Sequence, residues 1–309
     1  MLKLRLADKG FRRAFASPNA WIAASSSHPW TCARLKSRQR MRIKTCAIPV
    51  SDKDAKLKPS DFLTILRAVP SDCVLIGGQA VAWWAERYGI KAVVKGEEQE
   101  VTSRDIDFWG TREDLFQIAA HLKRRPALPN RYEMTLLVGA IQLEAGGKKT
   151  TLEVLHAVPG LDSANPLSAA VPEEIQAAVG GRKLLVMSPV SLVLAKLHAL
   201  RHFSQEDRQD LIHLQVSLKA SKAFITQALK QSARLALWNC NRLIEAHRQK
   251  PNRKMEQEHG FEILSAVPLD GIQSAVQEGN LADRERLQRF LSIQWPKVTA
   301  VAQIDPMEL

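Results

Sequence analysis

Long apolar runs are missing from this 309-residue chain, and its cysteines are few. No apolar stretch reaches the roughly 18 to 20 residues that a membrane-spanning helix needs, so we expect no membrane partner. No cysteine lies in a C-x-x-C or another metal-ligand spacing, which argues against a zinc site built on them. Such cysteine usage fits a reducing compartment, and we predict a cytoplasmic location. The cysteines are Cys32, Cys46, Cys73 and Cys240.

Acidic residues are scarce in the first 40 positions, which carry most of the net charge of +12. These positions hold nine of the 44 basic residues and one of the 32 acidic residues, Asp8. The rest of the chain therefore has 35 basic and 31 acidic residues. Basic surface supplies most non-specific affinity for phosphate backbones. Because the basic excess is concentrated in one terminal segment, the net charge gives only weak support for a nucleic-acid binder.

The same terminal segment is rich in Arg and Ser and shows no apolar periodicity. This composition fits a disordered arm, an extension upstream of a start at Met41, or an organelle transit peptide. In each case we expect the segment to lie outside the fold. The predicted organisation is a 1–40 extension, an α/β domain over 41–165 and a helical domain over 166–309.

The first part of the chain alternates strand and helix patterns. A helix over 60–68, with Ser60 as its N-cap, precedes a short strand at 73–76 and a helix over 79–88. Residues 89–104 lack a firm pattern and indicate a loop or a small insertion. The remaining predicted elements are strands 105–109, 132–145 and 150–156, a helix 112–123 capped by Thr111, and a hairpin turn 146–149.

From about residue 187 the pattern changes to helices alone. The predicted helices are 189–202, 205–218, 221–247, 268–278 and 281–293. No internal repeat or heptad array is visible. A strand and helix series followed by helices indicates an α/β (α+β) fold class, with a small mixed sheet in the head and an α-helical C-terminal domain.

The segment DIDFW places two acids on one face of a strand. Asp105 and Asp107 share that face at a separation of about 7 Å, and the apolar residues point the other way. A third acid, Glu153, alternates with apolar residues in TLEVL. If the two strands are neighbours, three carboxylates converge, and Mg²⁺ binds such oxygen ligands. Metals held in this way bridge phosphate oxygens and activate an attacking hydroxyl.

The glycine pair Gly77-Gly78 stands between the apolar strand and the helix that follows it. Backbone N–H groups at a helix N-terminus bind phosphate, and the absence of Cβ allows close approach. Taken alone, a glycine pair is more often a simple turn, and an acid-x-acid pair is often a solvated strand edge. The glycine pair, the acid pair and the third acid in this order are more specific than any one of them.

At these residues the sequence resembles the nucleotidyltransferase superfamily related to DNA polymerase beta. The pattern of that superfamily is a Gly-Gly or Gly-Ser pair after a strand, then an acid-x-acid strand, then a third acid on a later strand. The stretches LIGGQAV (75–81), TSRDIDF (102–108) and TLEVLH (151–156) are most similar to the bacterial AbiEii/AbiGii toxin-type nucleotidyltransferases. Residues 188–211 add an embedded lysine and a D-x-x-D segment, so the resemblance covers about residues 60–215.

The resemblance implies an enzyme that moves a nucleoside monophosphate from an NTP to an acceptor, with Mg²⁺ or Mn²⁺ as cofactor. It implies that Asp105, Asp107 and Glu153 form the metal site, or that Glu153 acts as base toward the acceptor hydroxyl. The implied nucleotide-binding residues are Gly77, Gly78, Gln79, Ser103, Lys196, Asp207 and Asp210. The implied partners are the NTP, an acceptor such as a tRNA end, another RNA or a protein, and a cognate antitoxin if the protein belongs to a toxin–antitoxin pair.

Two features depart from the pattern of that family. Gln79 stands where a small hydroxyl residue is usual, and the interval from the glycine pair to the acids is long. They leave open a non-catalytic protein that binds nucleotide or a partner, and a transferase acting on a small molecule such as an aminoglycoside.

Lys196 either neutralises phosphate charge or snorkels out of an apolar helix stretch. Trp83 and Trp84 are expected to pack, because adjacent positions cannot share one helix face.

Overall fold

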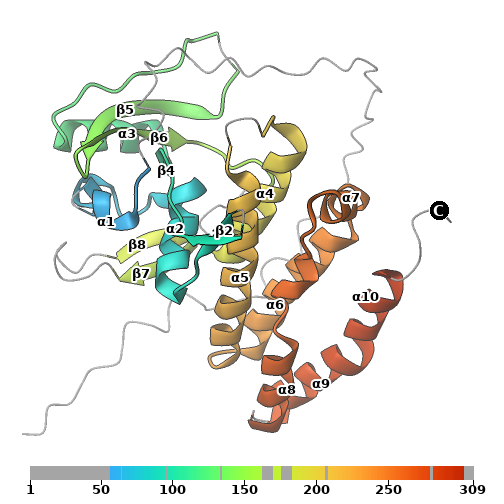
Figure 1. Cartoon of the computed structure of the whole chain (residues 1–309). Coiled ribbons are helices and arrows are strands. Elements are labelled where there is room, and N and C mark those ends of the chain that lie inside the picture. Colours follow the sequence, from blue (N-terminus) through green and yellow to red (C-terminus); the bar gives the residue numbers. More distant parts are fainter. Residues whose placement is uncertain are drawn as a thin grey trace, which may run out of the picture. The chain divides into compact units, whose positions relative to one another are not determined.

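The computed structural model of the chain describes residues 56–63, 65–94, 96–132, 134–161, 170–174, 183–205, 208–278 and 281–302. The predicted extension 1–40 and Asp207 lie outside the described residues. A mixed sheet with helices beside it is followed in the chain by helices (Figure 1). The predicted α/β fold class with a helical C-terminal region is confirmed.

The sheet of the head has six strands in the order β5-β6-β4-β1-β8-β7. Its strands are β1 (Val74–Ile76), β4 (Ile106–Trp109), β5 (Leu137–Ala145), β6 (Lys148–Leu155), β7 (Ala170–Glu174) and β8 (Lys183–Met187). The pairs β4–β6 and β1–β8 are parallel, and the other neighbours are antiparallel. The pair β4–β6 matters most for the site, because it sets the register between the two acid-bearing strands.

Helices flank this sheet, and a separate hairpin lies against α5 (Asp210–Leu229). They are α1 (Pro59–Phe62), a 3₁₀ turn (Ile65–Ala68), α2 (Gly77–Tyr88), the hairpin β2 (Ala92–Val94) with β3 (Glu97–Gln99), and α3 (Arg112–His121). Trp84 on α2 is 1% exposed, and its indole N–H donates to the Met187 carbonyl at 2.8 Å. The indole therefore ties α2 to the end of β8, which confirms that Trp84 packs in the core.

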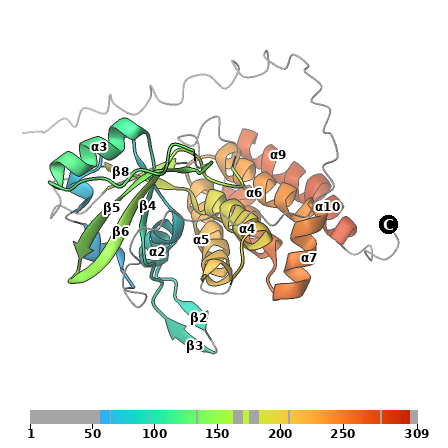
Figure 2. The same ribbon diagram turned by 90° about the horizontal axis from the view of Figure 1, so that it is seen from above.

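The C-terminal region consists of helices (Figure 2). They are α4 (Pro189–His202), α5 (Asp210–Leu229), α6 (Ala233–Arg248), α7 (Lys250–His259), a 3₁₀ turn (Ile263–Ala266), α8 (Leu269–Glu278), α9 (Leu281–Arg289), a π-helical turn (Phe290–Gln294) and α10 (Trp295–Ala302). Helices α4 and α5 lie against each other, and α5 also packs on α2 and α6. Helix α5 thus connects the head to the helical region.

Two clusters of buried apolar side chains form the core. The first is centred on the sheet with α2 and α3, and the second is built from α4 and the helices after it. Helices α4 and α5 contribute to both clusters: Leu192 and Val216 pack in the first, and Val193 and Leu214 in the second. Successive residues on a helix point in different directions, so one helix can serve two cores.

Several predicted helix boundaries are wrong. The helix predicted over 60–68 is split into α1 and a 3₁₀ turn, and α1 begins at Pro59 with Lys58 in the N-cap position. Proline is favoured at the first helical position because it lacks the N–H group that would be unsatisfied there. The break predicted between 218 and 221 is absent, because α5 runs unbroken to Leu229. The observed break precedes α6, where the Ser232 hydroxyl accepts the Leu235 backbone N–H at 3.3 Å.

Strands β7 and β8 were not predicted from the sequence. They extend the sheet past residue 165, the expected end of the α/β domain, and the insertion at 89–104 contains the β2–β3 hairpin. The apolar run of β8 pairs with β1, which is distant in sequence, so neighbouring residues do not reveal that β8 is a strand of this sheet.

The predicted cap of α3 is confirmed, since the Thr111 hydroxyl accepts the Asp114 backbone N–H at 3.2 Å.

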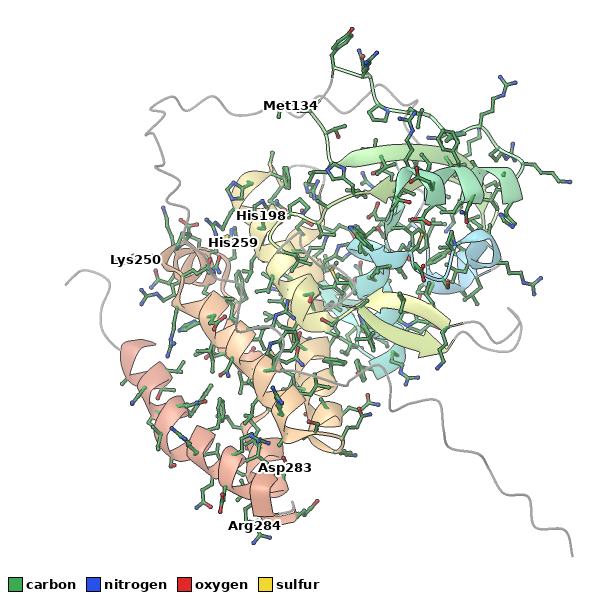
Figure 3. The ribbon with its side chains drawn as sticks, turned by 180° about the vertical axis from the view of Figure 1, so that it is seen from behind. Met134, His198, Lys250, His259, Asp283 and Arg284 are labelled. Atoms are coloured by element: carbon green, nitrogen blue, oxygen red, sulfur yellow. The ribbon has the colours of Figure 1, made fainter. Side chains whose placement is uncertain are left out.

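The segment between α3 and β5 carries the exposed apolar side chains of Tyr132 and Met134. Figure 3 shows Met134 projecting outward beside the sheet.

Among the described residues, no helix combines the length and the apolar character that crossing a bilayer requires.

Candidate active site

The glycine pair lies at the junction of β1 and α2, as the sequence predicts. Gly77 is the first residue of α2 and has a φ of +67°, a conformation that glycine adopts without strain. A Cβ atom added to Gly77 would lie 2.0 Å from Oδ2 of Asp107, and one added to Gly78 would lie 2.4 Å from Oγ of Ser103. The two glycines thus allow an acid and a hydroxyl to approach the start of the helix.

The acid-bearing strands are direct neighbours. In the parallel pair β4–β6, Asp107 is the register partner of Glu153, so the predicted approach of these strands is confirmed. Asp105 lies one residue before β4 instead of within it. Ile106 and Phe108 are fully buried on the other face, which fixes the direction of the acids through the alternation of the strand.

Burial and mutual repulsion act together on the acids. Burial raises the pKa of Asp107 well above its usual range, and the charges of Glu153 and Asp105 raise it further. Burial, followed by the charge of Asp105, raises the pKa of Glu153 to about 7. Burial also raises the pKa of Asp105, while Arg104 opposes the change. The three carboxyls therefore hold protons more tightly than free acids do, because burial and the neighbouring negative charges outweigh the nearby cations.

The donor set suits a hard cation that also has ligands from a substrate. Among the described residues, no group of three or more His, Cys, Asp and Glu side chains is gathered closely enough to hold a metal by itself. Mg²⁺ in phosphate-transfer sites is usually held by one or two carboxylates together with substrate phosphates. Two carboxylates in register beside a helix N-terminus, with raised pKa values, fit that kind of site.

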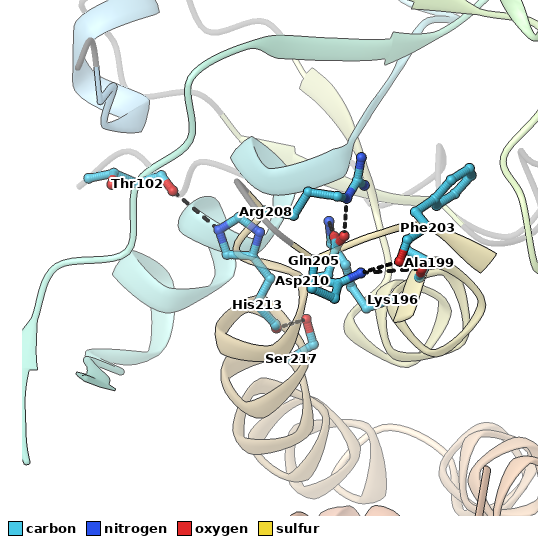
Figure 4. Close-up of polar contacts among 9 residues, drawn as sticks. All are labelled: Thr102, Lys196, Ala199, Phe203, Gln205, Arg208, Asp210, His213 and Ser217. Carbon is cyan, nitrogen blue, oxygen red and sulfur yellow. Dashed lines mark hydrogen bonds and ion pairs between the residues drawn. The ribbon is translucent and has the colours of Figure 1, made fainter. Parts of the chain in front are cut away.

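Asp210, the first residue of α5, lies in a different electrostatic environment (Figure 4). It is 2% exposed, and its two carboxylate oxygens accept from different cations. Lys196 donates to Oδ1 at 2.8 Å, and the Arg208 Nε–H donates to Oδ2. Burial alone would raise the pKa of Asp210, but Lys196 and Arg208 outweigh it and lower the pKa to about 2.

Lys196 does not snorkel to solvent. Its side chain is 12% exposed, and its ammonium group is bound to the buried Asp210 carboxylate. The positive charges of Lys196 and Arg208 both lower the pKa of Asp107, against the effect of burial. Phosphate binding by Lys196 remains a prediction, and any such contact would have to be shared with Asp210.

Gln79 and Ser103 support the backbone around the glycine pair. Gln79 is fully buried, and its amide nitrogen donates to the carbonyls of Leu57 at 3.2 Å and Ser103 at 3.3 Å. Leu57 and Ser103 also form an isolated antiparallel bridge. The Gln79 amide nitrogen is therefore occupied by two backbone carbonyls, and nucleotide binding by Gln79 stays a prediction. Its Oε1 has no hydrogen-bond partner within the described part of the chain.

Sequence reasoning missed two residues at the site, His213 and Arg208. His213 on α5 is 6% exposed, its Nε2 lies 3.2 Å from the Thr102 carbonyl, and its Cε1 would be 2.9 Å from a Cβ on Gly78. Burial and then the charge of Lys196 lower the pKa of His213 to about 3, so the ring is neutral. Arg208 stands inside the D-x-x-D segment, and that position is the signal that could have identified it.

Comparisons with known proteins assign no function to the chain. No protein-family model matches it, and no curated protein matches it. Among solved structures it is similar to an antigenic nucleotidyltransferase-like protein from Paracoccidioides brasiliensis, with 16% sequence identity and a TM-score of 0.34. This similarity covers 53% of the chain and 78% of the other protein. These values are too low to place the chain in a family.

Proposed function

We propose that this chain is a metal-dependent nucleotidyltransferase, which moves a nucleoside monophosphate from an NTP to an acceptor hydroxyl and releases pyrophosphate. The observation that carries the proposal is the position of Asp107, which lies opposite Glu153 in register and against Gly77 at the start of α2. Carboxylates that can bind a cation then lie beside a helix N-terminus that can bind phosphate. The order of the sequence motifs independently favours the same chemistry.

Each residue has a distinct role in this proposal. Asp107 and Asp105, together with Glu153, would hold Mg²⁺, for which Mn²⁺ could substitute. When bound, the cation neutralises phosphate charge in the transition state. The backbone N–H groups at Gly77 and Gly78 bind phosphate oxygens, assisted by the positive end of the α2 dipole. Glu153 either completes the ligand set or accepts the proton of the acceptor hydroxyl, and its pKa of about 7 suits the second role.

The acceptor is proposed from the resemblance to the AbiEii/AbiGii toxin-type enzymes. It is an RNA, such as a tRNA end, or a protein hydroxyl, and the protein then acts as the toxin beside a cognate antitoxin. An aminoglycoside-type acceptor uses the same phosphate chemistry and differs only in the acceptor cleft. The test must therefore detect transfer to all three classes of acceptor.

The experiment supplies each labelled NTP in turn with Mg²⁺ and a cell lysate or total RNA, and measures label in RNA, protein and small-molecule fractions. We expect label in the RNA or protein fraction with the parent and none with Asp107→Asn. Glu98→Gln on the exposed β3 strand is the control and should transfer as the parent does. Label confined to small molecules would favour the aminoglycoside-type acceptor. A folded parent that transfers no label to any fraction would contradict the proposal.

A further inference from the structure

The two cations at Asp210 are held to different extents. The Lys196 side chain is 12% exposed, whereas the Arg208 side chain is 45% exposed. The Lys196 ammonium is therefore enclosed with its carboxylate partner. Arg208 reaches the same carboxylate and still faces solvent along much of its length.

Arg208 uses only part of its guanidinium group in these contacts. Its Nε donates to Asp210, and no hydrogen bond from its two terminal nitrogens to the described residues is found. Figure 4 shows the terminal nitrogens directed away from Asp210. The guanidinium carbon lies 5.1 Å from the ring centroid of Phe203, an arrangement in which the ring face attracts the cation. One hydrogen bond and one ring contact thus orient the group and leave its outer edge available.

The available edge lies near the glycine pair. Asp210, which accepts from Arg208, is on α5 about one turn before His213, and Cε1 of His213 would be 2.9 Å from a Cβ on Gly78. Asp107 in turn lies against Gly77, where phosphate is proposed to bind. Arg208 is therefore a partly exposed cation, oriented by the protein, on the side of the acid cluster where α4 and α5 meet the head.

We propose that the two terminal nitrogens of Arg208 bind phosphate oxygens of the incoming NTP, and that Asp210 is the positioning residue that orients them. The inference rests on the proposed nucleotidyltransferase function and adds a substrate-contacting residue to it. The planar guanidinium fork matches two phosphate oxygens, which a lysine ammonium cannot do in the same geometry. Lys196 then helps mainly by holding Asp210 in place.

The test measures the affinity of the full chain for non-hydrolysable α,β-methylene NTP analogues with Mg²⁺ by calorimetry. Arg208→Gln should weaken binding by about 10- to 100-fold, the loss expected for hydrogen bonds to a charged group. Arg208→Lys keeps the charge but not the fork, so it should recover only part of the affinity. The control is Arg201→Gln, an exposed arginine at the end of α4, which should bind as the parent does.

Thermal unfolding without nucleotide separates a contact from a structural role. Arg208→Gln and Arg208→Lys should melt within a few degrees of the Arg201→Gln control while differing from it in affinity. Parental affinity in Arg208→Gln, or full affinity in Arg208→Lys, would overturn the bidentate contact and leave the proposed function standing. A parent that binds none of the analogues would remove both proposals together.

Discussion

One buried carboxylate and three half-buried carboxylates in this molecule have opposite electrostatic surroundings. The acid cluster of Asp105, Asp107 and Glu153 has raised pKa values, because burial and like charges oppose ionisation. Asp210 has a lowered pKa, because Lys196 and Arg208 bind its two oxygens directly. The chain thus satisfies one buried carboxylate with its own cations and leaves the neighbouring cluster without direct partners of opposite charge among the described residues.

This contrast separates an acid that stabilises the fold from acids that are available for a ligand. A buried ion pair becomes costly when one partner is removed, because the other charge is left uncompensated. A crowded set of like charges responds in the opposite way, since removing one charge relieves repulsion. The same substitution, Asp to Asn, should therefore have different consequences at the two places.

Asp210→Asn should give the largest loss of stability. It leaves Lys196 and Arg208 without their carboxylate, and Lys196 is almost enclosed. We expect the free energy of unfolding at pH 7 to fall by about 3 kcal/mol, measured by urea denaturation. Glu98→Gln breaks the exposed pair with Lys91 at 3.3 Å and should cost less than about 1 kcal/mol. Equal losses in the two variants would show that the Asp210 pairs contribute no more than surface pairs.

Gly77→Ala should rank second, with a loss of about 2 kcal/mol. The residue has a φ of +67°, and the new Cβ would lie 2.0 Å from the Asp107 carboxylate. Gly89→Ala is the matched control, because Gly89 has a φ of +63° but no atom within 4 Å of the added Cβ. The difference between the two melting temperatures isolates the contact with Asp107. Identical losses would mean that Asp107 moves aside without cost.

Glu153→Gln should change the pH dependence of stability. The fold holds the Glu153 proton up to a pKa of about 7, against an ordinary value of 4.5. The stability that this tightly held proton gives the folded protein is complete below pH 4.5 and is lost as the pH rises to about 7. In buffer without divalent cations, the variant should therefore gain about 1 to 2 kcal/mol over the parent between pH 5 and pH 8.

His213 changes stability in the opposite direction over part of this pH range. The fold lowers the pKa of His213 from an ordinary value of 6.5 to about 3. The stability that the neutral ring contributes is therefore lost as the pH falls below 6.5. His213 is present in both proteins, and the difference between parent and Glu153→Gln at each pH removes its effect. A difference that stays constant from pH 5 to pH 8 would show that Glu153 has an ordinary pKa.

Asp107→Asn should have the smallest effect on the stability of the ligand-free protein. The variant loses a like-charge contact with Glu153, so its free energy of unfolding at pH 8 should be unchanged or higher by less than about 1 kcal/mol. The rise in melting temperature that Mg²⁺ and an NTP analogue give the parent should shrink in the variant. A loss as large as that of Asp210→Asn would remove the contrast between the two sets of acids.

Much of the head could be predicted because its signals are local. The alternation in DIDFW, the glycine pair after an apolar run and the Thr111 cap each depend on a few neighbouring residues. Long-range strand pairing could not be predicted, because it depends on residues that are far apart in the sequence. Strand β8 acquires its role by pairing with β1, which lies more than 100 positions earlier in the sequence, and β7 joins the sheet only by pairing with β8.

The residue types available to the candidate site, and their order along the chain, follow from the sequence alone. The acids alternate with apolar residues whatever the fold, because side chains on a strand alternate by geometry. The position of Asp107 opposite Glu153 and against Gly77 depends on the tertiary structure, since register depends on which strands are neighbours. The contacts of Asp210 with Lys196 and Arg208 depend on it too, because α4 and α5 must pack together before these charges can meet.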